Sequence, residues 1–350
     1  MMPKNKMMKA AVLEGIGKIV YCEVEKPAPL AGEVLMRVRA TSICGSDVSR
    51  VLKGHRTMPL ILGHEAAGEV VEVGPGVDGK LLGLRAAVVP LMPCMRCAYC
   101  SQGLYSACTG YSFIGSRRNG TFAEYVTLPV ENLLFLPDDL DFEAGALIEP
   151  ATVALHALER GGFKPGQSAA ALGAGSIGLM AVQWLRKLGA QKIFVSDLND
   201  ENLACARSFG AHIAINPLHE DIVSRVAEET GGVDLALELA GAPQTLAQAI
   251  EITRPRGSVV LTGNQPKDAV FPAGLMEQIT RKELHVSGTW MSYSAPFPGH
   301  EWPDAAAALC SGDLNAAEMI THRFPLSEVE AVFKGIADRS FTYRKIILIP

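Results

Sequence analysis

The sequence predicts an α/β fold in which a Rossmann-type doubly wound parallel sheet is joined to a β-rich domain. A small apolar run at 169–172 passes through a glycine turn into a helix-period pattern, and strand and helix patterns then alternate as far as residue 288. Short strand-like runs occupy 9–43 and recur at 86–89 and 122–128. Alternating strands and helices are typical of a parallel sheet, whereas successive strands are typical of a β-rich domain.

Length and composition limit the class of protein. The chain has 350 residues, of which 48% are hydrophobic, so we expect about two domains with substantial cores. The formal net charge of −5 argues against a general nucleic-acid binder. No apolar run approaches the roughly 18 residues of a membrane span, and the Lys- and Met-rich residues 1–9 lack the apolar segment of a secretory signal. We therefore expect a cytoplasmic protein with no membrane partner.

The β-rich part begins with short strands at 9–13 and 19–24. Residues 33–40 alternate apolar and polar side chains, which predicts a half-buried strand. A helix is expected from Glu143 onward. At the other end of the chain, two short helices and a closing strand at 344–349 are expected to pack back onto this first domain.

The glycine turn has the spacing of a dinucleotide site. Gly173, Gly175 and Gly178 suit, in order, a tight turn, close approach to a pyrophosphate and close contact between helix and strand. Ser176 and Ile177 open the following helix, whose free N–H groups suit a pyrophosphate. The alternative is a βαβ unit with an incidental glycine turn.

An acidic residue supports the dinucleotide interpretation. Asp197 ends the next predicted strand and lies nineteen residues past Gly178, where a carboxylate that binds ribose belongs. Leu198 and Asn199 follow it, with no Arg to accept a 2′-phosphate. The sequence therefore favours NAD over NADP.

Three separated residues have the donor atoms of a catalytic zinc. Cys44 offers a thiolate and His64 an imidazole, and Glu149 offers a carboxylate in an apolar setting. Three protein ligands with an open fourth position are typical of catalytic zinc. Glu65 is an additional candidate ligand, and Asp47 is placed to orient His64. The alternative for the first two is a packed cysteine and a solvated histidine.

A second metal site is predicted with greater specificity. Four cysteines lie close together at gaps of two, two and seven residues: Cys94, Cys97, Cys100 and Cys108. Four thiolates complete a structural zinc with no open position. An iron–sulfur cluster fits less well, because the short last gap and following proline of the bacterial ferredoxin pattern are missing. Disulfides are unsuited to a reducing compartment.

Taken together, these motifs resemble the zinc-dependent medium-chain alcohol and polyol dehydrogenases. The motifs that carry the resemblance are Cys44-Gly45-Ser46-Asp47, Gly63-His64-Glu65, the four cysteines, Glu149-Pro150 and the Gly173 turn. The resemblance implies a GroES-like catalytic domain at 1–153 and 295–350, with a zinc lobe at 93–109, and an NAD-binding domain at 154–294. It implies zinc on Cys44, His64 and Glu149, with Glu65 alongside, a structural zinc on the four cysteines, and a homodimer or homotetramer.

Two departures from the family pattern are visible. Leu84 stands where the family commonly has Asp, and the residues before Met7 have no counterpart. For the oligomer, we expect pairing through an edge strand near 284–286, because unpaired edges invite partners.

Within this family the chain is most similar to members that oxidise a sugar alcohol phosphate, through Phe113–Arg118 and Gly288–Ser294. A phosphate needs cations, and the candidates are Arg117, Arg118 and Arg50. A solvated turn is the alternative for the first two. Dehydrogenation of an unphosphorylated polyol and a non-enzymatic nucleotide-binding role are the competing functions.

Other residues have expected roles at the reacting centre. Ser46 is expected to relay the alcohol proton outward, and the carbinol hydrogen leaves as hydride to NAD. Trp290 and Tyr293 are candidates for lining the substrate pocket, with a core position as the alternative.

Overall fold

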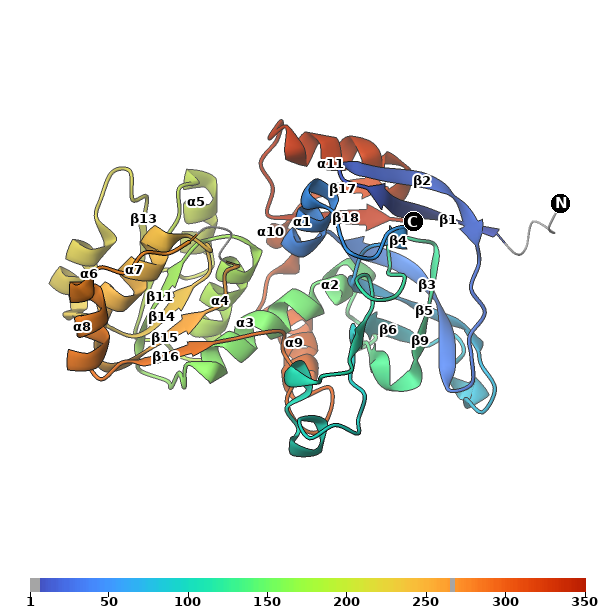
Figure 1. Cartoon of the computed structure of the whole chain (residues 1–350), viewed down its shortest axis with the longest axis horizontal. Helices are drawn as coiled ribbons and strands as arrows, with labels where there is room; N and C mark the ends of the chain where they lie inside the picture. Colours follow the sequence, from blue (N-terminus) through green and yellow to red (C-terminus); the bar gives the residue numbers. More distant parts are fainter. Residues whose placement is uncertain (1–6, 265–267) are drawn as a thin grey trace. The chain divides into compact units, whose positions relative to one another are not determined.

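The computed structural model describes residues 7–264 and 268–350 and divides the chain into two compact units (Figure 1). The residues before Met7, for which the family has no counterpart, lie outside the described residues. We call the units the β-rich unit and the nucleotide unit. The β-rich unit comprises Met1–Glu149, Tyr293–Gly312 and Ala316–Pro350, and the nucleotide unit comprises Pro150–Ser292 and Asp313–Asn315. In the described part of the chain, every helix is too short or too polar to span a bilayer.

The β-rich unit is built from three sheets. Its strands are β1 Met7–Gly15, β2 Lys18–Glu25, β3 Glu33–Ser42, β4 Leu60–Ile61, β5 Glu65–Val73, β6 Arg85–Val88, β7 Leu91–Met92, β8 Ser112–Phe113, β9 Tyr125–Pro129, β10 Leu133–Phe135, β17 Ile320–Pro325 and β18 Lys345–Ile349. The largest sheet has the order β10-β6-β5-β3-β18-β17, with β9 also paired to β3. The smaller sheets are β2-β1-β4 and β7-β8.

Strand β3 is more buried than its alternating sequence predicts. Only Arg37 and Arg39 are exposed, and the rest of the strand is buried. The reason is that Val34, Met36 and Val38 pack into a hydrophobic cluster with residues of β5, β6 and β9, and that the helix at Phe142–Ala146 also packs against β3. The half-buried prediction therefore fails for the ends of this strand.

The C-terminal strand returns to the centre of the β-rich unit. Ile347 and Leu348 of β18 pair antiparallel with Ser42 and Thr41 of β3, and β18 runs parallel to β17. This confirms the expectation that the tail packs back onto the first domain. It also brings Lys345 to the strands that carry the residues of the site.

The nucleotide unit contains one sheet of six parallel strands in the order β13-β12-β11-β14-β15-β16. The strands are β11 Ser168–Leu172, β12 Lys192–Ser196, β13 Ile213–Ile215, β14 Val233–Glu238, β15 Thr253–Leu261 and β16 His285–Gly288. The order reverses between β11 and β14, which is the arrangement of a doubly wound Rossmann sheet. The predicted parallel sheet is therefore confirmed.

Helices connect and cover these strands (Figure 1). They are α1 Gly45–Lys53, α2 Phe142–Ala146, α3 Ile148–Arg160, α4 Ser176–Lys187, α5 Asp200–Ser208, α6 Ile222–Thr230, α7 Pro243–Ile252, α8 Ala273–Arg281, α9 Glu301–Cys310, α10 Ala316–Met319 and α11 Val329–Ala337. In the nucleotide unit, α4 packs against α5, while α7 packs against α6 and α8. The chain passes from one unit to the other inside α3, a few residues before the expected boundary at 153.

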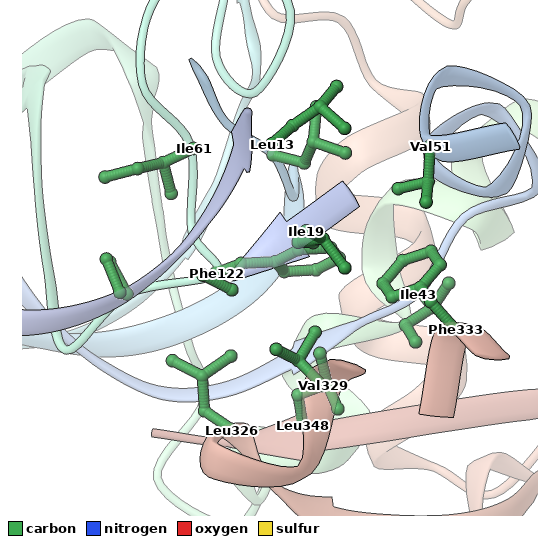
Figure 2. Packing of buried hydrophobic residues seen from close by; sticks show 14 of the residues in the cluster. Leu13, Ile19, Ile43, Val51, Ile61, Phe122, Leu326, Val329, Phe333 and Leu348 are labelled. Atoms are coloured by element: carbon green, nitrogen blue, oxygen red, sulfur yellow. The ribbon is translucent and has the colours of Figure 1, made fainter. Parts of the chain in front are cut away.

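One hydrophobic cluster fixes α1 in the β-rich unit. Figure 2 shows Val51 of α1 pointing into the same cluster as Phe333 of α11 and Phe122. Phe122 is fully buried, and its ring centroid lies 6.2 Å from that of Phe333. Burial of one such ring stabilises the fold by about 1.5–3 kcal/mol. This packing holds the helix whose first turn carries the polar residues of the site.

Candidate active site and metal centres

The first turn of α1 sets the orientation of the Cys44 thiol. Cys44 is the N-cap residue, and its Sγ accepts the Ser46 N–H at 3.5 Å. Asp47 Oδ2 in turn accepts the Cys44 N–H at 3.2 Å, which completes a capping box. A helix at this position is not among the predicted elements, although Asp47, three residues after the cap, is an available helix-start signal.

His64 is held by a glycine before it and a carboxylate beside it. Gly63 has φ +90°, and a Cβ there would lie 2.4 Å from Phe122 Cδ1, so a side chain at this position is excluded. His64 Nδ1 lies 3.5 Å from Asp47 Oδ1. Nδ1 makes no hydrogen bond within the described residues, so the role of Asp47 in orienting the His64 ring stays a prediction.

The charges around His64 favour a proton or a metal on its ring. Burial lowers the pKa of His64, but Asp47 and Cys44 raise it more, so its pKa lies well above the ordinary value. Burial raises the pKa of Asp47, but His64 and Arg50 lower it more, so that carboxyl remains ionised at neutral pH. A metal cation would take the place of the imidazole proton in this negative environment.

The structure gathers a thiol, an imidazole and a carboxylate. Donor atoms of Cys44, His64 and Glu65 all lie within 4.8 Å of one another. This is the donor chemistry of a zinc site, so the residues fit the metal. Glu65 is also engaged elsewhere, because Ser42 Oγ donates to it and Lys345 Nζ lies 2.5 Å from its Oε2.

Glu149 does not belong to this group of donor atoms, but the charges of the group act on its carboxyl. Burial raises the pKa of Glu149 to about 7, with His64 and Lys345 lowering it and Glu65 raising it. The structure thus brings the predicted third ligand into the field of the cluster, at the start of α3. Sequence reasoning missed Lys345, whose only signal is a single charge at the head of the apolar run of β18.

The four cysteines of the lobe come together. Their Sγ atoms lie within 4.8 Å of one another, and all are free thiols. Cys97 Sγ and Cys100 Sγ are 3.6 Å apart, close to the roughly 3.8 Å that tetrahedral Zn–S bonds of about 2.3 Å require. Backbone N–H groups, that of Cys100 foremost, lower the pKa of Cys97 to about 5, so this group is a thiolate at neutral pH. The lobe fits a structural zinc.

The glycine turn of the nucleotide unit is shaped for a dinucleotide. Gly173 has φ +115°, and a Cβ on Gly178 would lie 1.9 Å from Gly173 O, so both positions require glycine. A Cβ on Gly175 would instead meet open space, on the side where a ligand can approach the backbone. Gly175 caps α4 without a side-chain bond, and Ser176 and Ile177 form the first turn of that helix. These features fit a pyrophosphate.

Asp197 lies against this turn. Its Oδ2 accepts the Ala174 N–H at 2.6 Å and its Oδ1 accepts the Asn199 N–H at 2.8 Å. These bonds fix the carboxylate at the carboxyl end of β12, next to the switch point of the sheet. Its position suits hydrogen bonding to the ribose hydroxyls of NAD.

The three arginine candidates have different surroundings. Arg118 donates to Glu33 Oε1 and to Thr127 Oγ1, both at 3.0 Å, so it links β3 to β9, and its role as a phosphate ligand stays a prediction. Arg117 lies over the Tyr111 ring, 3.6 Å from its centroid, and donates to the carbonyl of that residue. Within the described residues, Arg117 makes no hydrogen bond or ion pair with Cys44, His64 or Glu65.

Arg50 is the candidate at the cluster. Its Nη1 donates to Ser46 Oγ at 2.9 Å and to Asp47 Oδ1 at 3.1 Å. Across the described chain, no group accepts from its Nε or Nη2. The side chain is 19% exposed, so one edge of the guanidinium remains open to a ligand.

The two aromatic candidates, Tyr293 and Trp290, differ in burial. Tyr293 is 5% exposed, its ring stacks on Phe297 and Trp302, and its hydroxyl accepts the Leu91 N–H at 3.0 Å. The side chain therefore has the core position that was the alternative for it, and its pocket-lining role stays a prediction. Trp290 is 58% exposed and its pocket-lining role stays a prediction.

Comparison with known proteins agrees with this geometry. The description "Alcohol dehydrogenase GroES-like domain" matches residues 30–138, and "Zinc-binding dehydrogenase" matches residues 176–311. Galactitol 1-phosphate 5-dehydrogenase of Escherichia coli (strain K12) is 40% identical over 321 residues, covering 91% of this chain and 92% of that protein. Sorbitol dehydrogenase of Bacillus subtilis (strain 168) is 33% identical over 356 residues, covering 99% and 98%.

Solved structures give the same result. The crystal structure of galactitol-1-phosphate dehydrogenase from Escherichia coli matches with a TM-score of 0.94 at 38% identity, covering 98% of this chain and 100% of that one. Fold and site together define a zinc-dependent dehydrogenase with a dinucleotide-binding sheet. The chain belongs to the zinc-type medium-chain alcohol dehydrogenase family. It is therefore a zinc-dependent oxidoreductase that uses a nicotinamide dinucleotide.

Proposed function

We propose that the protein oxidises a secondary hydroxyl of a sugar alcohol phosphate, converting galactitol 1-phosphate to L-tagatose 6-phosphate with hydride transfer to NAD. One observation carries this proposal. Arg50 has an open guanidinium edge and lies one helical turn from Ser46. Both residues belong to α1, the helix that Cys44 caps. The cluster supplies the chemistry of alcohol oxidation, and Arg50 supplies a cation for a phosphate.

In this proposal, Cys44, His64 and Glu149 hold the catalytic zinc. When bound, zinc polarises the substrate hydroxyl and lowers its pKa. Asp47 holds the His64 ring in one orientation through Nδ1. Lys345 neutralises Glu65, which leaves Glu65 beside the metal as a group that tunes its charge.

Ser46 is the proposed proton relay. Its Oγ accepts a bond from Arg50, so its own hydroxyl hydrogen is available to donate elsewhere. A serine hydroxyl has no useful pKa near neutrality, so it passes a proton on and is not its final acceptor. The neighbouring guanidinium favours the negative charge that develops on this oxygen during transfer.

NAD binds, in this proposal, on the turn Gly173–Gly178 with its ribose on Asp197. The open space at Gly175 admits the pyrophosphate, and the free N–H groups of α4 receive it. Asp197 would repel a 2′-phosphate, which supports NAD over NADP.

Arg50 is the proposed phosphate ligand, and one pair of variants tests it. Replacing a charge-assisted hydrogen bond costs about 1.5–3 kcal/mol, so Arg50→Met should raise KM for galactitol 1-phosphate roughly 10- to 100-fold. KM for galactitol and sorbitol should stay unchanged. Arg56→Met is the matched control, because Arg56 is exposed, lies close by in the chain and has no partner among the described residues. Equal losses on phosphorylated and free polyols would refute the phosphate role.

A second candidate function is oxidation of an unphosphorylated polyol such as sorbitol or xylitol. The observation that favours it is the match to sorbitol dehydrogenase along 99% of this chain. Under this alternative Arg50 serves only to orient Asp47 and Ser46, and Arg50→Met lowers kcat for every substrate.

We also propose that the subunits pair through β16. This strand lies at the edge of the parallel sheet, and its Val286 is 39% exposed. A homodimer or homotetramer in light scattering that becomes monomeric on Val286→Lys would support this route, and an unchanged mass would exclude it.

A further inference from the structure

The nucleotide unit contains a polar cavity at one end of its sheet, and the glycine turn at Gly173–Gly178 lies at the other end. Its volume is about 470 Å³. Gln167 directly before β11, Asp234 near the start of β14 and His285 at the start of β16 line it, so it lies at the amino ends of these strands. Gly173 and Asp197 follow the carboxyl ends of β11 and β12. The two sites are therefore separated by the length of the sheet.

The lining of this cavity is positively charged. Four fixed cations, Arg160, Lys164, Arg254 and Arg256, face two carboxylates, those of Glu159 and Asp234. The excess of two positive charges contrasts with the formal charge of −5 on the whole chain. Within the described residues, the side chains of Arg160, Lys164 and Arg256 have no hydrogen-bond or ion-pair partner. Three cations thus line one hollow without a counter-charge of their own.

Hydrogen bonds of Arg254 cross-link the floor of the cavity. Arg254 donates to Asp234 Oδ1 at 3.1 Å, to Ser168 Oγ at 3.2 Å and to Gly232 O at 2.6 Å. These bonds neutralise Asp234 and leave Glu159 as the remaining acid. They also tie the starts of β11, β14 and β15 together beneath the free cations.

Arg256 is held in a backbone conformation that suits glycine better than arginine. Its φ is +62°, in the left-handed region, which costs an ordinary residue about 1–2 kcal/mol. Its N–H donates to Lys282 O at 2.7 Å, so the tertiary structure enforces the conformation. Strain of this kind in a residue that lines a cavity is a sign of function.

We propose that this cavity, the arginine pocket, binds a small polyvalent anion of the phosphate class, such as an oligophosphate or a phosphorylated metabolite. Guanidinium groups bind phosphate oxygens with two parallel hydrogen bonds. The volume is that of a small-molecule site. A nucleic-acid polymer is disfavoured, because the net negative charge of the chain repels it. The proposal is independent of the polyol substrate.

Calorimetric titration of the full zinc-loaded chain with tripolyphosphate tests the proposal. Saturating NADH is present throughout, so that the coenzyme turn is already occupied. One tripolyphosphate per chain is expected to bind, with affinity that falls as ionic strength rises. Arg256→Gly should weaken binding at least tenfold while raising the denaturation midpoint, because glycine relieves the strain. Arg256→Lys keeps the charge but loses the paired donors of the guanidinium, so it should weaken binding less than Arg256→Gly does.

The matched control is Arg339→Gly. Arg339 is also exposed and has φ +54°, but it lies outside the pocket. This control should raise the denaturation midpoint without changing tripolyphosphate binding. If Arg256→Gly disturbs folding, Arg160→Gln combined with Lys164→Gln removes the charge without touching the strained position and should weaken binding equally.

Adenosine triphosphate forms a second arm of the titration. Similar affinities for the two ligands identify the phosphate chain as the recognised part, and tighter binding of the nucleotide adds a contact to its nucleoside; both support the pocket. Absence of saturable binding by either ligand overturns the proposal. Binding that is unchanged in Arg256→Gly and in the double variant, or that is lost equally in Arg339→Gly, also overturns it.

Discussion

Lys345 Nζ lies 2.5 Å from Glu65 Oε2, although the two residues are 280 positions apart, and their side chains are only 2% and 1% exposed. The pairing arises because β3 lies between β5 and β18: Ser42 faces Glu65 on one side and Ile347 on the other. Burial lowers the pKa of Lys345, but Glu65 and Cys44 raise it more, so the amine stays charged. The last strand of the chain thus supplies the counter-charge at the cluster.

Removing this counter-charge should be costly. Lys345→Met leaves the Glu65 carboxylate buried and uncompensated, and breaking a buried pair in this way lowers the free energy of unfolding by about 3–5 kcal/mol. Urea denaturation measures the loss. The double variant Glu65→Gln with Lys345→Met should recover most of it, and Lys334→Met, at an exposed lysine of α11, should change little. If Lys345→Met unfolds at the same urea concentration as the wild type, the pair of Lys345 and Glu65 does not stabilise the packing of β18 and β5.

Gly63 is predicted to be indispensable for the position of His64. Gly63→Ala adds a Cβ that would lie 2.4 Å from the buried ring of Phe122, so the ring must move. The substitution also forces an alanine into a left-handed backbone conformation, which adds strain. The control Gly76→Ala has φ +82° but meets nothing within 4 Å, so it should cost only about 1–2 kcal/mol. Gly63→Ala should cost about 1–3 kcal/mol more and should reduce zinc content. Equal stabilities would contradict the steric argument.

The cysteine lobe should hold one of two zinc ions. Cys97→Ser removes a thiolate ligand, so metal analysis should fall from about two zinc ions per chain to about one. Cys310→Ser is the control, because Cys310 is an exposed free thiol and belongs to no group of potential ligands among the described residues. Retention of two ions in Cys97→Ser would mean that the lobe does not bind the second zinc.

Asp197 should govern the choice of coenzyme. Asp197→Ser removes the acceptor for the ribose hydroxyls and the charge that repels a 2′-phosphate. KM for NAD is expected to rise about tenfold, and KM for NADP is expected to fall. The ratio of kcat/KM for NAD to kcat/KM for NADP should therefore decrease. Steady-state kinetics with the two coenzymes measure this ratio. An unchanged preference for NAD would place the selecting group elsewhere.

The cap of α6 gives a pH-dependent test of stability. The hydroxyl of Ser224, followed by its N–H, lowers the pKa of Asp221, so the ionised cap is favoured in the folded state. Its contribution is present above the unfolded pKa of about 3.9 and is lost as pH falls through the lower folded value. Asp221→Ala should therefore cost about 1 kcal/mol at pH 7 and less at pH 3 in urea denaturation. Glu228→Ala, exposed on the same helix and without a partner among the described residues, should have little effect at either pH.

Features that depend on local spacing could be predicted from the sequence. The Gly173 turn, the strand that follows it and the four gathered cysteines need only neighbouring residues to form. The parallel sheet followed from the alternation of strand and helix patterns. In each case the period or the spacing is itself the physical cause of the structure.

Features that depend on distant pairing could not be predicted. No residue near Lys345 in the sequence indicates that it pairs with Glu65. In the same way, no residue near Arg118 indicates that it pairs with Glu33, which is 85 positions away. Tyr293 was ambiguous for the same reason, because only the fold supplies the Leu91 N–H and the two stacked rings. Helix α1 was missed because its cap is a cysteine, an uncommon N-cap residue.

In the proposed reaction, NAD oxidises a phosphorylated polyol whose hydroxyl lies at the cluster of thiol, imidazole and carboxylates and whose phosphate is held by Arg50. The most direct measurement is NADH formation by the zinc-loaded protein, with galactitol 1-phosphate, galactitol and sorbitol compared side by side. We predict a kcat/KM for galactitol 1-phosphate at least tenfold above those of the two free polyols. Equal or greater turnover of sorbitol, or no NADH formation from any of the three, would contradict the account.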